Sequence, residues 1–227
     1  MSTLDYFSLG HPLTRFRSHF AVRARRRMFE LFMQLLQPTA ADRVLDLGVT
    51  PDTTLAESNL FEALYPHRAR LVAASIEDAS GLERHFPGLR CVRIEPGPLP
   101  FKDDEFDILF CSAVLEHVGT REQQAAFLAE CLRVSRRVFL TTPNKGFPVD
   151  FHTFLPLLHW LPQRWHQASL RVLGQEFLSH TENLNLVGVA DLASLYPPDS
   201  SWHLHRIPLL GLTSNLVLVG QRQPANS

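Results

Sequence analysis

The segment from Arg43 to Asp52, RVLDLGVTPD, constrains the fold more than any other stretch of this chain. A valine and two leucines surround one acid, Asp46, and Gly48 ends the apolar run. This pattern predicts a buried strand over residues 43–47 that turns sharply at the glycine. A carboxylate buried without a partner is strongly disfavoured. Because ligands of doubly wound α/β domains lie at the carboxyl ends of the strands, Asp46 and Gly48 mark the place where we expect a ligand.

Strand and helix patterns alternate over residues 43–142, which predicts an α/β fold with a doubly wound, mostly parallel sheet. Further strands are expected at residues 70–76, 89–94, 106–113 and 137–141. Three capping-box pairs predict helix starts, at Asn59 with Glu62, Ser80 with Glu83 and Thr120 with Gln123. Near the C-terminus, LHRIPLLGL and NLVLVGQ lie close enough to pair as an antiparallel hairpin, which brings the sheet to about seven strands.

The chain is expected to form a single domain over residues 1–227. Residues 1–40 would be an N-terminal arm and a helix, because apolar positions recur every three or four residues from Phe16 until Pro38 stops the pattern. Residues 41–145 would be the core. Residues 146–182, dense in aromatics, leucine and proline, would cap the strand ends, and residues 183–227 would add the closing helix and hairpin.

Charge and cysteine content limit the partners. A net charge of −1, from 22 basic and 23 acidic residues, argues against nucleic acid. Four arginines crowd the first helix, at positions 23, 25, 26 and 27; we favour a solvated helix face over a peripheral membrane contact. Three cysteines within apolar runs indicate reduced core thiols. With no signal sequence or spanning segment recognised, the expected location is cytoplasmic, and the oligomeric state is left open.

Acids follow three successive predicted strands: Asp46, then Glu77 with Asp78, then Glu95. In a parallel sheet these ends lie side by side, and they suit a ligand with a cation and vicinal hydroxyls. An acid after the second strand is the usual partner of a ribose. The alternative is that each acid caps the following helix. No glycine-rich phosphate cradle is present, which argues against a nucleoside triphosphate.

Four segments, VLDLGVTPD, ASIED, LPFKDDEFDILFCSAVLEHV and NLVLVG, together resemble the class I S-adenosylmethionine-dependent methyltransferases. The resemblance covers roughly residues 28–145 and, more weakly, the hairpin, and LPFKDDEFDILFCSAVLEHV is its specific part. It implies a Rossmann-like methyltransferase fold, with residues 41–145 as the cofactor-binding core. The family's first loop carries three glycines at alternate positions, whereas here Thr50 and Asp52 replace the second and third.

The resemblance also implies roles for individual residues. Glu77 would hold the ribose hydroxyls of S-adenosylmethionine, with Asp78 beside it, and Glu95 would lie near the adenine amino group. The methionine part would be lined by Asp46, Gly48, Val49 and Thr50. Ser112 and Ala113, at the end of the fourth strand, would lie next to the sulfonium.

His117, just past the fourth strand, is the expected general base for a hydroxyl acceptor, because histidine titrates near neutrality. Glu116 is the alternative at the same position, and a structural histidine is the competing interpretation. Histidines also recur every seven residues at 152, 159 and 166, but prolines at 156 and 162 interrupt helical geometry, so no metal site is expected.

The sequence therefore predicts methyl transfer from S-adenosylmethionine to a small molecule or a glycan or lipid precursor, most simply at oxygen. A methyltransferase-fold binding or scaffold protein without activity is the first alternative. A nicotinamide-dependent oxidoreductase is the second and is disfavoured, because the G-x-G-x-x-G loop is missing.

Overall fold

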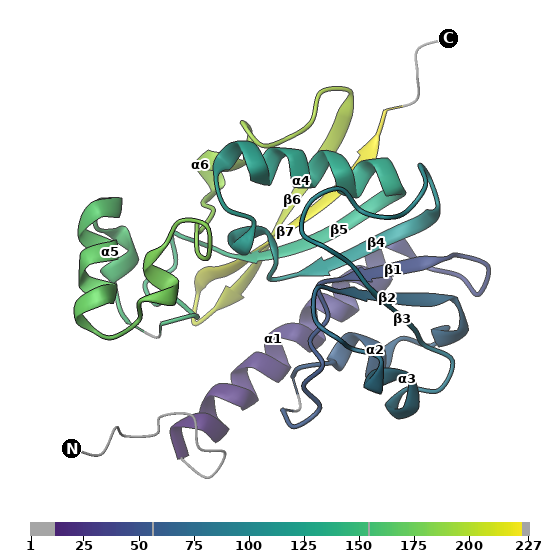
Figure 1. Cartoon of the computed structure of the whole chain (residues 1–227), viewed down its shortest axis with the longest axis horizontal. Coiled ribbons are helices and arrows are strands. Elements are labelled where there is room, and N and C mark those ends of the chain that lie inside the picture. The colour runs from purple at the N-terminus through teal and green to yellow at the C-terminus, as the bar shows by residue number, and fades with distance from the viewer. Residues whose placement is uncertain (1–11, 56, 154, 224–227) are drawn as a thin grey trace.

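The computed structural model describes residues 12–55, 57–153 and 155–223, with side chains from residue 21 onward. Its centre is a seven-stranded sheet in the order β3-β2-β1-β4-β5-β7-β6 (Figure 1). The strands are β1 Val44–Leu47, β2 Leu71–Ser75, β3 Arg90–Arg93, β4 Phe106–Ser112, β5 Ser135–Pro143, β6 Ser200–Leu209 and β7 Leu212–Arg222. The first five run parallel, and β7 pairs antiparallel with both β5 and β6. The predicted mostly parallel sheet with a C-terminal hairpin is confirmed.

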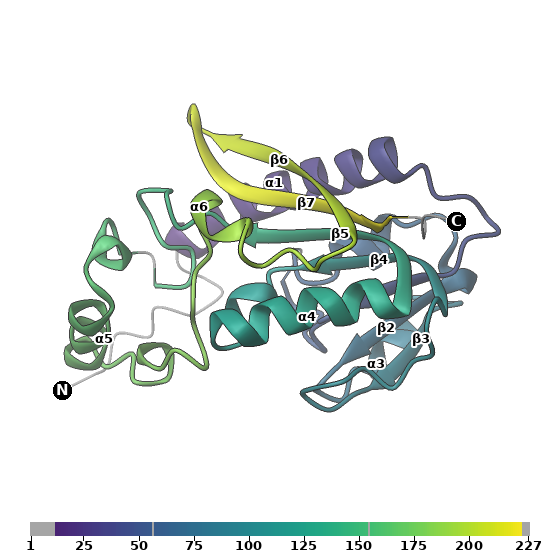
Figure 2. The ribbon, with the colours of Figure 1, turned by 90° about the horizontal axis from the view of Figure 1, so that it is seen from above.

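Helices cover both faces of the sheet. The α-helices are α1 Pro12–Leu36, α2 Leu60–Leu64, α3 Gly81–His85, α4 Arg121–Val134, α5 Gln163–Val172 and α6 Val189–Leu192. Short 3₁₀ turns are η1 Arg68–Arg70, η2 Leu115–His117, η3 Leu158–Trp160 and η4 Phe177–Ser179. Seen from above, α4 lies on one side of the sheet and α1 on the other (Figure 2).

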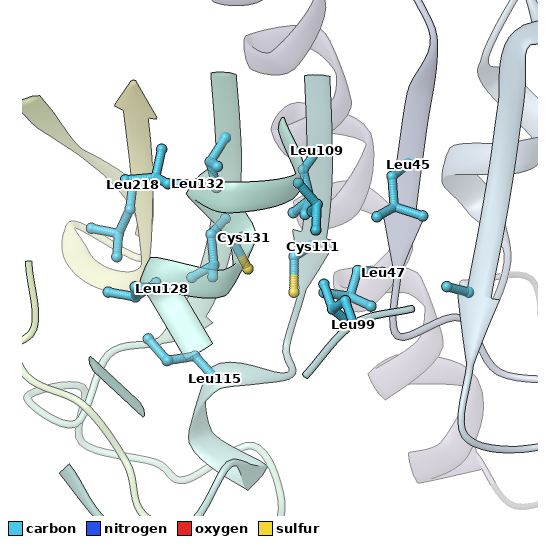
Figure 3. Close-up of a cluster of buried hydrophobic side chains, with 14 of the residues drawn as sticks. Leu45, Leu47, Leu99, Leu109, Cys111, Leu115, Leu128, Cys131, Leu132 and Leu218 are labelled. Carbon is cyan, nitrogen blue, oxygen red and sulfur yellow. The ribbon is translucent and has the colours of Figure 1, made fainter. Parts of the chain in front are cut away.

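Two apolar clusters hold these layers together, and they follow from the alternation of side chains along each strand. In β1, Leu45 and Leu47 face the cluster that contains the α4 residues Leu128 and Leu132 (Figure 3). Val44 faces the opposite cluster, with residues of α1, α2 and α3. Asp46 points to this second side as well, so its carboxylate has to be accommodated beneath α1 and α2.

Phe32 of α1 is the centre of the second cluster and is fully buried. Its ring meets those of Phe61, Phe110 and Phe139 edge-on, with centroids 5.1, 5.5 and 5.4 Å away. Arg137 of β5 also donates a hydrogen bond from Nη1 to the carbonyl of Leu36 at 2.8 Å. The first helix is thus fixed on α2, β4 and β5 together.

All three predicted helix starts are confirmed, but only one of them has its capping box. Thr120 and Gln123 form the expected capping box of α4. Asn59 and Ser80 occupy the N-cap positions of α2 and α3, as predicted, but make no side-chain cap bond, so the capping boxes predicted there are wrong. Asn59 donates instead to the carbonyl of Asp52 at 2.6 Å.

The segment between β5 and α6 contains η3, α5 and η4, and α5 lies beyond the end of the sheet at which β5 finishes (Figure 1). No helix in the described ranges is both long enough and apolar enough to span a bilayer. Most of the predicted N-terminal arm lies outside the described residues.

Candidate functional site

The end of β1 forms a sharp turn at Gly48. Its φ of +95° is a conformation that favours glycine, and a Cβ there would overlap a methyl group of Val114. The Gly48 and Val49 amides both donate to the carbonyl of Ala74 in β2, at 2.8 and 3.3 Å. The backbone after Asp46 is therefore anchored to the neighbouring strand while the carboxylate faces α1.

Thr50 and Asp52, which stand where the family pattern has glycine, turn their polar groups into their own loop. Thr50 Oγ1 accepts from the Asp52 amide at 3.4 Å. The Asp52 carboxylate accepts hydrogen bonds from the hydroxyls of Thr54 and Ser58, at 2.6 and 2.7 Å, and these bonds lower its pKa to about 2. Neither side chain lines the cavity described next.

A cavity opens between this loop, α1, α2 and the ends of β1 and β4, and its empty space, including the solvent at its opening, is about 470 Å³. The lining residues come from all of these elements: Arg25, Met28, Phe29, Asp46, Gly48, Val49, Ser58, Leu60, Phe61, Glu62, Phe110 and Ser112. Four of the predicted cofactor residues are thus in one wall: Asp46, Gly48, Val49 and Ser112.

Three charged groups of the cavity wall influence one another. Burial raises the pKa of Asp46 well above its usual range, and the charge of Glu62 raises it further, while Arg25 opposes the shift. Burial likewise raises the pKa of Glu62 to about 7, against the effects of its own backbone amide and Arg25. Arg25 donates from Nη1 to the carbonyls of Glu57 and Ser58, at 2.8 and 3.3 Å. No described residue donates a hydrogen bond to the Asp46 carboxylate, which leaves it available to a ligand.

The raised pKa of Glu62 predicts a pH-dependent stability. Because the folded chain binds this proton more tightly than the unfolded chain, Glu62 contributes stability that is fully present below its ordinary pKa of 4.5 and is lost as the pH rises to about 7. Between pH 5 and pH 8 the wild type should lose about 2 kcal/mol more unfolding free energy than Glu62→Gln. Urea unfolding at both pH values measures this, with exposed Glu182→Gln as control. Parallel profiles for wild type and Glu62→Gln would contradict it.

The carboxylates predicted for the nucleoside lie elsewhere than in this wall. Glu77, Asp78 and Glu95 are all exposed. Asp78 accepts a hydrogen bond from the Ser80 amide at 3.0 Å, as an acid at the start of α3 would. The Glu77 amide donates to Ser75 Oγ at 3.1 Å, which holds the chain where Glu77 leaves β2. Glu77, Asp78 and Glu95 thus lie exposed after the carboxyl ends of β2 and β3, and their contact with a nucleoside stays a prediction.

The end of β4 is tied to β5. Ser112 Oγ and Thr141 Oγ1 are 3.0 Å apart, and the Ala113 amide donates to the Thr141 carbonyl at 2.9 Å. Ala113 has a φ of +57°, so the chain turns abruptly there. This turn leads directly into η2, which carries Glu116 and His117.

Glu116 and His117 meet His152 of the distant 146–182 segment. The two Nε2 atoms of His117 and His152 are 3.1 Å apart, and Glu116 Oε1 lies 3.7 Å from His152 Nε2. Asp150 Oδ1 contacts His152 Nδ1 at 3.0 Å, and Thr142 donates to Glu116 Oε2 at 3.0 Å. Of the three regularly spaced histidines, only His152 joins this cluster; His159 contacts the carbonyls of Lys145 and Phe147.

Burial dominates the electrostatics of the cluster. It raises the pKa of the fully buried Glu116, against the opposing charges of His152 and His117. Burial would also lower the pKa of His152, but its hydrogen bond to Asp150 and the charges of Glu116 and Asp150 outweigh burial and raise that pKa. Burial would raise the pKa of Asp150, but hydrogen bonds from His152 and Thr153 and the charge of His152 outweigh burial and lower that pKa to about 2.

The sequence interpretation missed Arg25, Glu62 and Asp150. Arg25 was grouped with its exposed neighbours, although it precedes Met28, Phe29 and Phe32 by three, four and seven residues and so shares their helix face. That spacing was the available signal. Glu62 and Asp150 carried no comparable signal, because their positions depend on tertiary contacts.

Residues 61–138 match the family described as "Methyltransferase domain". No curated protein sequence matches the chain. Among solved structures, the 1,6-didemethyltoxoflavin-N1-methyltransferase of Burkholderia thailandensis, with bound 1,6-didemethyltoxoflavin and S-adenosylhomocysteine, is similar at a TM-score of 0.59 and 15% identity, covering 92% of this chain and 88% of that one. The PH0226 protein of Pyrococcus horikoshii is similar at a TM-score of 0.58 and 15% identity, and the match covers 88% of this chain and 91% of that one. The YcgJ protein of Bacillus subtilis is similar at a TM-score of 0.55 and 14% identity, and the match covers 88% of this chain and 100% of that one.

Proposed function

Residues 61–138 match a methyltransferase domain, and from that premise we propose that this chain is a class I, S-adenosylmethionine-dependent methyltransferase that methylates a hydroxyl group of a small molecule or of a glycan or lipid precursor. The observation that carries the proposal is the pairing of two features at the same end of the sheet. One is the cavity lined by the carboxyl groups of Asp46 and Glu62 and the guanidinium of Arg25, and the other is the Glu116–His117–His152 cluster, which can take a proton from an acceptor.

The cavity wall fits the cofactor. S-adenosylmethionine ends in an ammonium and a carboxylate, and the wall presents an Asp46 carboxylate without a hydrogen-bond donor next to the Arg25 guanidinium. Gly48 itself lines the cavity, and its missing Cβ makes room for the Val114 side chain. Thr50 and Asp52 are held in their own loop and leave that wall clear.

When bound, S-adenosylmethionine supplies an electrophilic methyl group on a sulfonium. The protein's contribution to such a displacement is chiefly alignment and exclusion of water. We assign the methionine part to Asp46, Gly48, Val49 and Thr50 and the sulfonium neighbourhood to Ser112 and Ala113. Glu77 and Asp78 would meet the ribose, and Glu95 the adenine.

The acceptor would be deprotonated at the cluster. His117 Nδ1 lies 2.6 Å from the carbonyl of Asn183, so this nitrogen donates its proton and Nε2 is left as the atom that can accept one. His117 is exposed, which allows an acceptor to reach it, whereas Glu116 is buried behind it. We therefore assign the general base to His117, with Glu116 as its supporting acid.

Residues 146–182 would form the acceptor-binding cap. This segment supplies His152 to the cluster and exposes large apolar side chains, including Trp160 and Trp165, each more than half exposed. Such a surface suits an acceptor with an apolar part. We place the enzyme in the cytoplasm, because Cys91, Cys111 and Cys131 are all free thiols.

Calorimetric titration with S-adenosylmethionine and S-adenosylhomocysteine tests the proposal. Binding of both is expected. If neither binds, the chain is a scaffold built on the methyltransferase fold. A screen of candidate acceptors with methyl-labelled cofactor then identifies the substrate, and labelling of nitrogen or carbon in place of oxygen would overturn the proposed acceptor atom.

Replacing Glu77 with alanine should weaken cofactor binding at least tenfold, because a charge-assisted hydrogen bond contributes about 1.5–3 kcal/mol. The fold should be unaffected, since the side chain is exposed. Calorimetry of the variant beside exposed Glu182→Ala makes the measurement. An affinity equal to that of the wild type would remove Glu77 from the ribose site.

A further inference from the structure

We propose that Glu116, His117 and His152 bind a divalent transition-metal ion of the zinc type. The three ligand atoms, one from each side chain, all lie within 4.8 Å of one another. The two imidazole nitrogens are 3.1 Å apart, and the carboxylate oxygen is 3.7 Å from the nitrogen of His152. Tetrahedral zinc with bonds of about 2.0–2.1 Å places its ligand atoms about 3.3–3.4 Å apart, and the two separations that involve His152 approach this value.

The hydrogen bonds of the two histidines leave their Nε2 atoms as the possible metal ligands. His117 Nδ1 faces the carbonyl of Asn183 at 2.6 Å, and His152 Nδ1 faces the carboxylate of Asp150 at 3.0 Å. Both partners can only accept, so each Nδ1 carries a hydrogen, and the Nε2 of a neutral ring then presents a lone pair. The two Nε2 atoms are 3.1 Å apart.

The third group is also an acceptor. Glu116 is fully buried, and no described residue donates a hydrogen bond to its Oε1. A buried carboxylate oxygen left without a donor is costly. Three potential electron-pair donors therefore converge on one point, and a metal cation placed there would be bound by all three.

The surrounding contacts are those that orient metal ligands. Metal-bound histidines usually donate their other ring nitrogen to a carboxylate or a backbone carbonyl. His152 has the first arrangement, through Asp150, and His117 has the second, through Asn183. Glu116 is fixed as well, because Thr142 donates to its Oε2 at 3.0 Å. Each of the three ligands is thus held in place by a separate partner.

Two histidines and one carboxylate suit zinc, and three protein ligands leave one coordination position open. The open position lies on the side of exposed His117. Its use rests on the proposed function: an acceptor hydroxyl bound there would lose its proton more readily, because a metal ion lowers the pKa of a bound hydroxyl. His117 would then activate the acceptor as a ligand, in place of acting as a free base. Binding of the metal itself does not depend on that role.

The test uses the full chain, stripped with a chelator and titrated with Zn²⁺ by calorimetry, with bound zinc counted by mass spectrometry. We expect one equivalent per chain. His152→Ala should weaken zinc binding at least a hundredfold, and Asp150→Asn about 10–100-fold through the lost support of His152. His203→Ala, which removes an exposed histidine of β6, should bind zinc as the wild type does.

The outcomes separate the metal site from the proposed function. Absence of stoichiometric zinc, or full-strength zinc binding by His152→Ala, would overturn the metal site even if S-adenosylmethionine binds normally. Zinc binding without cofactor binding would leave the metal site standing and overturn the proposed function. A proton between the two Nε2 atoms is the alternative to a metal ion, and nitrogen NMR distinguishes the two. An imidazolium signal of His152 that does not change when zinc is added would also refute the site.

Discussion

Alanine in place of His117 is expected to slow methyl transfer to a hydroxyl acceptor by about a hundredfold or more, which is the usual contribution of a positioned general base. The same loss is expected if His117 acts as a metal ligand, because either role activates the acceptor oxygen. Cofactor affinity should be unchanged, since His117 does not line the cavity beside Asp46. Single-turnover measurements with labelled cofactor give the rate of the chemical step directly.

A purely structural His117 would behave differently. Its contact with the Asn183 carbonyl joins η2 to a distant loop, and loss of that contact alone would lower the melting temperature without a matching loss of rate. Added imidazole should partly restore the rate of His117→Ala if the side chain acts on the acceptor. A variant that turns over at the full rate would end the assignment. His203→Ala serves as the control for a histidine outside the site.

Gly48→Ala should lower the free energy of unfolding by about 3 kcal/mol. Its φ of +95° costs a residue with a Cβ about 1–2 kcal/mol, and overlap with the Val114 methyl adds about 1–3 kcal/mol. The turn would also shift away from the cavity wall, so cofactor binding should fall with stability. Urea unfolding and calorimetry measure the two effects.

Gly97 offers a matched control, because its φ is +119° and a Cβ there would meet no atom within 4 Å. Gly97→Ala should therefore show the conformational cost without the overlap and lose about 1–2 kcal/mol. The overlap can be removed separately: in a Val114→Ala background, Gly48→Ala should cost less than it does in the wild type. Equal costs of Gly48→Ala in both backgrounds would contradict the packing argument.

The order of the elements could be predicted because each strand is a short apolar run closed by a breaker. Capping contacts were less predictable than helix starts, as α2 shows. Asn59 and Glu62 have the spacing of a capping box, yet α2 has only five residues and is drawn against the sheet by Phe61. The Asn59 side chain donates a hydrogen bond to the Asp52 carbonyl instead, and Glu62 lines the cavity. Thr120, in contrast, is the N-cap of a fourteen-residue helix, and there the capping box predicted from the local sequence forms.

The site was predictable where it follows a strand and unpredictable where it depends on long-range contacts. Asp46, Gly48 and Ser112 lie in the cavity wall because each marks the end of a strand. His152 lies 35 residues from His117 in an irregular segment, and no local pattern indicates their contact. Arg25 lines the cavity, whereas its neighbours Arg23, Arg26 and Arg27 are exposed, so the local composition favoured solvent for all four.

The position of Phe32 has a consequence for how the chain is made. Its ring is enclosed by Phe61, Phe110 and Phe139, so α1 cannot be buried until more than a hundred further residues have left the ribosome. Contacts this distant in sequence are slow to form. The first helix to be synthesised should be among the last to dock, and during translation its apolar stripe is a surface for chaperones to protect.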